Sequence, residues 1–189
     1  MPDAPRRCAR ALAIAALLGA GAAPAAELRL QPASSEIAFT SRQMGVPVQG
    51  RFKSFDAEVD FDPARPDAAR IALRIALASA AIGTAETEAE LAKPGWFDTQ
   101  RFPVASFVAS AVRPAGTGRL EVAGRLTLKG TSRDVVIPVS LQQTLAQTTA
   151  TGSFTLRRSD WRIGDGDWSD PALVADEVQV RFKLVLAAP

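Results

Sequence analysis

A row of alternating carboxylates is the first feature of this sequence that could carry chemistry. Asp56, Glu58 and Asp60 alternate with apolar residues, so on a strand they would share one face, about 6.6 to 7 Å from one to the next. This distance overlaps the carboxylate separation of inverting glycosidases, which makes a secreted, carboxylate-based hydrolase one hypothesis. A polar face opposite an apolar one is more commonly the solvated side of a sheet, and we favour that interpretation.

A second acidic cluster, Asp165-Gly166-Asp167-Trp168-Ser169-Asp170, contains residue types that bind calcium. The glycine and the terminal glutamate of an EF-hand loop are not at the required positions. We therefore predict a solvated turn beside a packed tryptophan, and no metal site.

The residue types that are missing narrow the function further. Histidine is absent and Cys8 is the only cysteine, so the usual zinc sites and histidine-assisted serine nucleophiles cannot be built. No serine begins an S-x-x-K motif, and no G-x-S-x-G elbow occurs. The sequence predicts a protein that is not an enzyme, with no catalytic residues and no cofactor.

Residues 1–25 have the features of a cleaved export signal. Three arginines precede a short apolar run, and Ala23-Pro24-Ala25 supplies the small residues that a signal peptidase reads. We expect cleavage after Ala25 or one residue later and export, which leaves residues 26–189 as one cysteine-free domain. The signal carries three arginines and one aspartate, so the 22 basic and 20 acidic residues of the chain become 19 of each. Such a neutral domain has no overall field that would attract nucleic acid.

Alternation of apolar and polar residues with a period of two dominates the rest of the chain and predicts eight or nine strands. It is clearest in residues 55–61, 119–129 and 177–186, where apolar side chains face one way and polar side chains the other. Residues 104–112 are apolar on both faces, so we expect this strand to lie deeper.

Two short helices are predicted between these strands. Thr87 and Glu90 have the spacing of a capping box, and Pro94-Gly95 would end the helix that follows. A second short helix or turn is expected near Ser159-Asp160-Trp161.

Three all-β architectures fit the pattern: a closed barrel, a two-sheet sandwich and an outer-membrane barrel. The last is disfavoured because the chain has no tyrosine and only 6% aromatic residues, whereas membrane barrels carry aromatic girdles. Pro138 inside an apolar run also favours an edge or a bulge. Alternation is the same in a barrel and in a sandwich, so the residue pattern leaves these two open.

Four motifs occur in order along nearly all of residues 26–189. They are Gly50-Arg51-Phe52-Lys53-Ser54-Phe55 with Val59-Asp60-Phe61-Asp62-Pro63; Trp96-Phe97-Asp98 with Arg101-Phe102-Pro103 and Phe107; Gly124-Arg125-Leu126-Thr127-Leu128-Lys129-Gly130-Thr131-Ser132-Arg133; and Ser159-Asp160-Trp161-Arg162-Ile163-Gly164 with Trp168-Ser169-Asp170 and Val174-Ala175-Asp176-Glu177-Val178. This ordered set strongly resembles the YceI-like family of periplasmic proteins. One segment departs from it: many members carry an Arg-Asp pair and two phenylalanines where this chain has Ala85-Glu86-Thr87-Glu88 and a tryptophan.

The resemblance implies an all-β fold, a single antiparallel eight-stranded lipocalin-like barrel with one or two short helices. It also implies that the apolar interior binds a polyisoprenoid or another long-chain amphiphilic lipid, with a quinone-like lipid as a further candidate. On this interpretation the protein is a periplasmic carrier that exchanges its lipid with a membrane-bound donor or acceptor. The hydrolase, or a structural β-domain that binds nothing, remains the alternative.

The strand faces supply the candidate binding residues. Small strand residues such as Ala57, Ala150 and Gly152 favour a cavity over a fully packed core. The expected lining consists of Phe39, Phe52, Phe61, Leu73, Ile75, Phe107, Leu126, Phe154 and Phe182. We expect Lys93, Trp96 and Arg101 at the entrance, where the two cations could meet an anionic head group. An apolar plug flanked by solvated cations would give the same pattern.

Overall fold

The computed structural model describes residues 27–187, so the predicted export signal lies outside the described residues. The strands are β1 (Glu27–Leu30), β2 (Glu36–Gln43), β3 (Val46–Phe52), β4 (Phe55–Asp60), β5 (Arg70–Ala76), β6 (Ala80–Ala81), β7 (Val104–Pro114), β8 (Arg119–Leu128), β9 (Thr131–Gln143), β10 (Gln147–Arg157) and β11 (Glu177–Ala187). One α-helix, α1 (Ala85–Leu91), and five 3-10 helices (Pro32–Ser34, Pro66–Ala68, Leu77–Ser79, Arg158–Trp161 and Gly166–Trp168) complete the described part. None of the described helices is long and apolar enough to cross a membrane.

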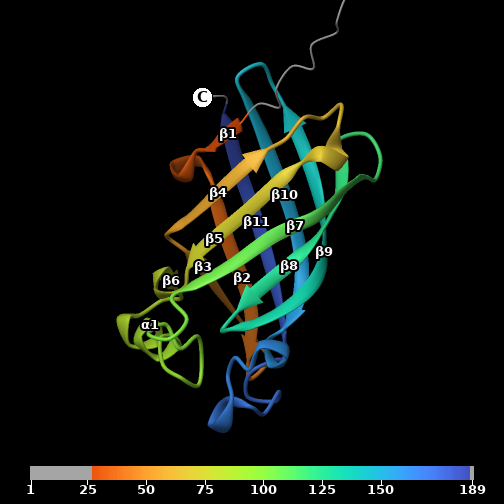
Figure 1. Cartoon of the computed structure of the whole chain (residues 1–189). Helices are drawn as coiled ribbons and strands as arrows, with labels where there is room; N and C mark the ends of the chain where they lie inside the picture. The colour runs from red at the N-terminus through yellow and green to blue at the C-terminus, as the bar shows by residue number, and fades with distance from the viewer. Residues whose placement is uncertain (1–26, 188–189) are drawn as a thin grey trace, which may run out of the picture.

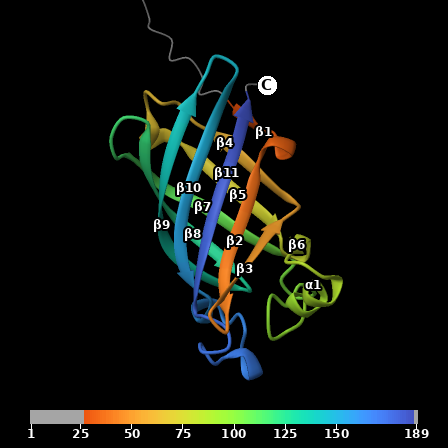
Figure 2. The same cartoon turned by 180° about the vertical axis from the view of Figure 1, so that it is seen from behind.

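The strands close into a barrel (Figures 1 and 2). Its order is β1-β4-β5-β7-β8-β9-β10-β11, and pairing of β1 with β11 completes a ring of eight antiparallel strands. Nearer the start of β11, residues 179–183 pair with β2 and not with β1. Strand β3 pairs with β2, and β6 pairs with β3, so these strands extend the sheet beyond the ring. Closure confirms the predicted eight-stranded barrel and excludes the sandwich that alternation had left open.

The interior is built by the predicted alternation. Along β8, Val122, Leu126 and Leu128 are buried, whereas Glu121 and Arg125, which occupy alternating positions next to them, are exposed. Because successive side chains on a strand point to opposite faces, each apolar series lies inside the barrel. The inward-facing apolar residues of the eight barrel strands thus contribute to one core cluster.

The expectation for β7 was wrong. Phe107 faces the interior and is buried, but Val104 and Val108 lie on the outer face and are 47% and 54% exposed. Strand β7 therefore has one face towards the interior and one towards solvent, like the other strands of the barrel, and its outer valines are not buried. Single exposed valines are common on protein surfaces, so an apolar outer face is weak evidence for burial.

The ladder between β9 and β10 covers less than half of either strand. It joins residues 139–143 to residues 148–152 and ends next to Pro138, which pairs with Glu121 on β8. A proline has no N–H to donate, so it is tolerated where a ladder ends. This position agrees with the edge or bulge that the sequence indicated.

Helix α1 begins earlier than the sequence predicted. Thr84 is its N-cap, and its hydroxyl accepts a hydrogen bond from the N–H of Thr87 at 3.4 Å. Both threonines are suitable caps, but Thr84 has the extended backbone that an N-cap needs. The helix and the loop after it form a small lobe beside the barrel (Figure 1).

Candidate ligand-binding cavity

Two cavities lie end to end inside the barrel. The first chamber, of about 130 Å³, lies towards β1, and the second chamber, of about 230 Å³, lies towards α1. Four residues line both of them, namely Ile75, Leu126, Phe154 and Val180. A dry apolar cavity of about 150 Å³ is enough for a ligand the size of benzene. Together the chambers offer an elongated apolar space.

All nine residues that the sequence predicted as lining do line these chambers. The first chamber has Phe61, Leu73, Ile75, Phe107, Leu126, Phe154 and Phe182, and the second has Phe39 and Phe52 in addition to the shared residues. Alternation explains this outcome, since it fixes which face of a strand a residue occupies. Contact of these side chains with a ligand stays a prediction.

Glycines on the inner face make room for phenylalanine rings. A Cβ atom on Gly50 would lie 2.3 Å from the ring of Phe39, and one on Gly124 would lie 2.5 Å from the ring of Phe107. Each ring thus lies against the wall over a glycine and does not project into the middle of the barrel. The space left by such a glycine is filled by a ring, so only part of the cavity comes from small residues.

The first chamber is almost entirely apolar. Ser106 and Thr148 are the polar residues among those that line it, and Thr148 is buried and accepts a hydrogen bond from Gln143 at 3.4 Å. Such a lining can take a hydrocarbon chain but offers little to a polar group.

The second chamber is also mainly apolar, but a small part of its surface is polar. Its lining includes Arg42, Glu90 and Arg158. Trp96, one of the predicted entrance residues, lines this chamber, and its ring lies 5.7 Å from that of Trp168. The polar side chains of the cavity are therefore gathered at the α1 end.

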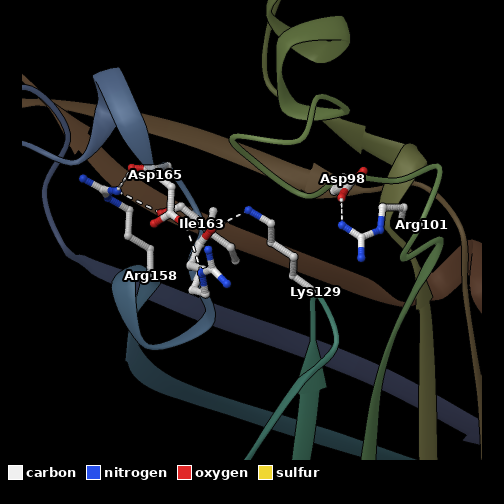
Figure 3. A network of polar contacts seen from close by, with 8 residues as sticks. Asp98, Arg101, Lys129, Arg158, Ile163 and Asp165 are labelled. Carbon is white, nitrogen blue, oxygen red and sulfur yellow. Dashed lines mark hydrogen bonds and ion pairs between the residues drawn. The ribbon is translucent and has the colours of Figure 1, made fainter.

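The two predicted entrance cations lie elsewhere. Lys93 is 62% exposed and pairs with Glu90 at 2.5 Å, and Arg101 is 76% exposed and pairs with Asp98 at 3.7 Å. Neither is among the residues that line the chambers. Figure 3 shows Arg101 turned towards Asp98. A role of Lys93 or Arg101 in head-group binding stays a prediction without support from this geometry.

Sequence reasoning missed Arg158, the buried cation of the second chamber. Its side chain donates five hydrogen bonds to backbone carbonyls and none to a carboxylate. The acceptors are Ala175 (3.2 Å), Ile163 (2.9 Å), Gly164 (2.8 Å), Trp168 (2.7 Å) and Val174 (2.7 Å). Arg158 is 3% exposed, and Figure 3 shows it beside Ile163. Its acceptors are carbonyls, so no residue type near it in the sequence signals this role.

These bonds organise residues 158–176, which we call the closing segment because they lie across the α1 end of the barrel (Figure 1). The segment is tied to the α1 lobe, where Gly164 N–H donates to the carbonyl of Gly95 at 2.8 Å. It is tied to the β2–β3 hairpin, where Met44 N–H donates to the carbonyl of Leu173 at 2.8 Å. Anchors on both sides of one end make this segment the floor of the second chamber.

Two ionisable groups in or beside the closing segment have a shifted pKa, namely Lys129 and Asp176. Burial lowers the pKa of Lys129, against the opposing effect of Asp165 and Asp98, and its ammonium donates to the carbonyl of Arg162 (Figure 3). Burial by itself would raise the pKa of Asp176, but hydrogen bonds from Ser159 and the charge of Arg158 outweigh it and lower that pKa.

The family model described as the YceI-like domain matches residues 28–186. The chain belongs to the YceI-like family. Over 82% of the chain and 98% of the other, it superposes on the crystal structure of Burkholderia cenocepacia BcnA with a TM-score of 0.81 and 40% identity. A polyisoprenoid binding domain from Saccharophagus degradans, 18% identical, matches 88% of this chain and 100% of its own length with a TM-score of 0.70.

Sequence comparison gives the same family. A UPF0312 protein of Pseudomonas putida (strain W619) is 33% identical over 123 residues, which are 64% of this chain and 64% of that protein. A UPF0312 protein of Azotobacter vinelandii is 29% identical over 65% of each chain. This YceI-like chain therefore matches slightly less than two thirds of the length of these relatives.

The carboxylates that the sequence singled out lie apart from the chambers of this YceI-like barrel. Asp56 and Glu58 are exposed, opposite Arg74 and Ala72 of β5, on the outer face of β4. Among residues 27–187, no group of three or more acidic residues could hold a metal ion. Asp56 and Glu58 thus lie on a solvated strand face, whereas Asp60 is half-buried and its Oδ1 has no hydrogen-bond partner among the described residues.

Proposed function

We propose that this YceI-like protein is a periplasmic carrier for a polyisoprenoid or a similar long-chain amphiphilic lipid. The observation that carries the proposal is the pair of adjoining chambers that share four lining residues, one wholly apolar towards β1 and the other with a few polar side chains towards α1. An elongated cavity of this kind matches a long apolar chain with a polar end. The related fold of the Saccharophagus degradans polyisoprenoid binding domain supports the same ligand class.

Burial of the lipid's hydrocarbon chain would supply the affinity. Each five-carbon isoprene unit moved out of water contributes on the order of 4 kcal/mol, at about 0.8 kcal/mol per CH₂. In a cell such a lipid resides in a membrane, where its chain is already out of water. Transfer from bilayer to barrel then gains little from the chain, so the shape of the chambers and their polar groups decide which lipid is taken.

The same geometry disfavours the alternative functions. The exposed carboxylates of β4 face solvent, so a hydrolase would have no enclosed site around them. A structural β-domain would have no need of a cavity of about 230 Å³ at its α1 end.

The proposal is tested by native mass spectrometry of the protein purified from its own host. We expect the protein to carry a co-purifying lipid that solvent extraction releases and identifies. A protein that arrives empty and also fails to take up added polyprenols would overturn the proposal.

Export is tested separately. In fractionated cells we expect the mature protein in the periplasm, with an N-terminus at residue 26 or 27. An intact Met1 in that fraction would contradict cleavage, and recovery of the protein from the cytoplasm alone would contradict export.

A further inference from the structure

The barrel wall has a place where two neighbouring long strands stop pairing although both continue. The ladder between β9 and β10 ends at the pair Val139 and Gly152. Beyond this pair, residues 131–138 of β9 and residues 153–157 of β10 remain in strand conformation, but none of them pairs across to the other strand in the part of the chain that the structure describes. We call these two stretches the lateral seam.

Each strand of the lateral seam is paired only on its other side. Strand β10 pairs with β11 along its whole length, and residues 131–140 of β9 pair with β8. On the seam side, the two strand edges carry backbone N–H and C=O groups without a ladder partner, and such groups need solvent. Parting the seam therefore breaks no ladder hydrogen bond, whereas parting β8 from β9 or β10 from β11 would break a continuous ladder. Regions held by few backbone hydrogen bonds open most readily.

The lateral seam borders both chambers. Ile137 and Phe154 line the first chamber, and Phe154 and Leu156 line the second. A hydrocarbon chain that passed between the two strand edges would thus reach Phe154, which both chambers share. On the outside, a groove of about 570 Å³ lies over the end of the ladder, and its lining includes Pro138 and Ser153, the first residues of the seam. The seam therefore has cavity residues on its inner side and a groove at its outer side.

A polar contact closes the far end of the seam. Arg133 belongs to the same alternating series of β9 as Val135 and Ile137, yet its side chain is 49% exposed. Its Nε donates to the carbonyl oxygen of Asp160 at 3.0 Å, its Nη2 lies 3.6 Å from Asp160 Oδ1, and its Cζ lies 6.0 Å from the centre of the Trp161 ring. Asp160 lies in the 3-10 helix that follows β10, so this contact joins β9 to the continuation of β10. The seam is fastened by the ladder at one end and by Arg133 at the other.

We propose that a lipid enters and leaves the barrel sideways through the lateral seam, and that the contact between Arg133 and Asp160 is the latch that restrains its opening. The proposal rests on the proposed function, since it requires that a lipid binds. Passage through the α1 end would instead require the closing segment to move and to break the hydrogen bonds of Arg158, three of which are buried. A route restrained by an exposed contact opens at lower cost.

A covalent staple across the seam tests the route. If the register of the ladder continued, Val136 would lie opposite Thr155, and both residues are exposed. In a Cys8→Ser background, which has no other cysteine, Val136→Cys and Thr155→Cys are joined by a short bismaleimide. The matched control joins Val108→Cys to Arg125→Cys, which are exposed direct partners in the β7–β8 ladder. Mass spectrometry establishes that each staple has formed.

The probe is tritiated geranylgeraniol, taken up from phosphatidylcholine vesicles and released to an excess of empty vesicles. We expect the seam staple to slow both uptake and release about tenfold or more and to leave Kd within about twofold, because closing a gate changes rates and not the bound state. The control staple should change neither rate. Unchanged rates in the seam-stapled protein, or an equal slowing by the control staple, overturn the proposal and leave the lipid carrier standing. If the unstapled protein takes up no geranylgeraniol, the carrier function fails and the lateral route fails with it.

Variants of the latch give an independent readout. Arg133→Gln should speed uptake and release alike by about 2- to 10-fold and leave Kd unchanged, because a restraint on opening affects both directions equally. Asp160→Asn should have a smaller effect, since the backbone carbonyl of residue 160 still accepts the hydrogen bond from Arg133. Arg125→Gln is the matched control, because it breaks an exposed ion pair with Asp134 at 3.2 Å that lies across the continuous β8–β9 ladder. Rates equal to those of the control, or a change of Kd without a change of rates, overturn the role of Arg133 as a latch.

Discussion

Gly152 on β10 lies directly opposite Phe182 on β11, and a Cβ atom on Gly152 would come within 2.3 Å of the phenyl ring and 2.7 Å of the carbonyl oxygen of Pro138. The ring therefore occupies the place of a side chain on its neighbour. Since Phe182 also lines the first chamber, this pair sets both the packing of the wall and the width of the cavity.

Replacing Gly152 by alanine should destabilise the barrel by about 1 to 3 kcal/mol, because the ring and the Pro138 carbonyl must both shift. Urea denaturation followed by circular dichroism measures the change. Gly95→Ala is the control, since its Cβ would meet the carbonyl of Asp165 at an ordinary 3.7 Å. A second substitution, Phe182→Leu, should recover part of the loss. Equal stability of the two alanine variants would contradict the account.

Arg158→Met should destabilise the protein by roughly 3 kcal/mol or more, because five carbonyls, three of them in buried bonds, lose their donor at once. Limited proteolysis should then cut within residues 158–176. Arg158→Lys should also destabilise the protein, because an ammonium has three donors on one atom and cannot replace the five donors of the guanidinium. Arg162→Met is the control: this arginine is 80% exposed, and its loss should change stability by no more than about 0.5 kcal/mol. An Arg158→Met protein as stable as the control would refute the role of these bonds.

The lowered pKa of Asp176 predicts a specific acid sensitivity. A group whose pKa is lower in the folded state stabilises the protein above its ordinary pKa of 3.8, and this contribution is lost as the pH falls through the lowered value. The stability difference between the wild type and Asp176→Asn should therefore be constant near neutral pH and shrink below about pH 4. Denaturation at a series of pH values measures it. A stability difference that grows on acidification would show that the pKa of Asp176 is raised, and not lowered, by folding.

Filling the first chamber should block lipid uptake. Ala150 is buried and lines this chamber, so Ala150→Phe places a ring where the chain would lie. We expect binding to weaken at least tenfold, with a cost in stability of about 1 to 3 kcal/mol. Thr151→Phe on the exposed outer face of the same strand is the control. Native mass spectrometry and thermal denaturation report the two effects, and normal uptake by Ala150→Phe would argue against binding in this chamber.

The wall of the barrel could be predicted from the sequence, whereas its end could not. A residue such as Leu73 or Phe154 is assigned to the interior by its place in an alternating series, which needs no knowledge of the rest of the fold. Closure of the sheet into a barrel was predicted from the family resemblance, because alternation does not indicate what a strand face packs against. Arg158 shows the limit, since its acceptors are carbonyls up to 17 residues away, brought together by the path of the closing segment.

The candidate entrance shows the same limit from the other side. Lys93 and Arg101 were selected for their charge beside aromatic residues, but nearby carboxylates already pair with both. Ser41 was visible only as a member of a strand, and only the fold shows that its hydroxyl oxygen is buried without a hydrogen-bond partner among residues 27–187. Local sequence gives the type and the face of a residue, while its partners depend on the tertiary fold.

The partners of Arg158 carry dipoles and no net charge, which bears on how the protein responds to salt. Dissolved ions screen solvent-exposed charges beyond about 10 Å at an ionic strength near 0.1 M, and at closer range as the concentration rises. The ion pairs on the surface of the described residues, such as Arg133 with Asp160, weaken accordingly. The guanidinium of Arg158 is buried, and its bonds do not depend on a second charge. We therefore expect the Arg158 bonds at the α1 end of the barrel to persist alike in dilute and in concentrated salt.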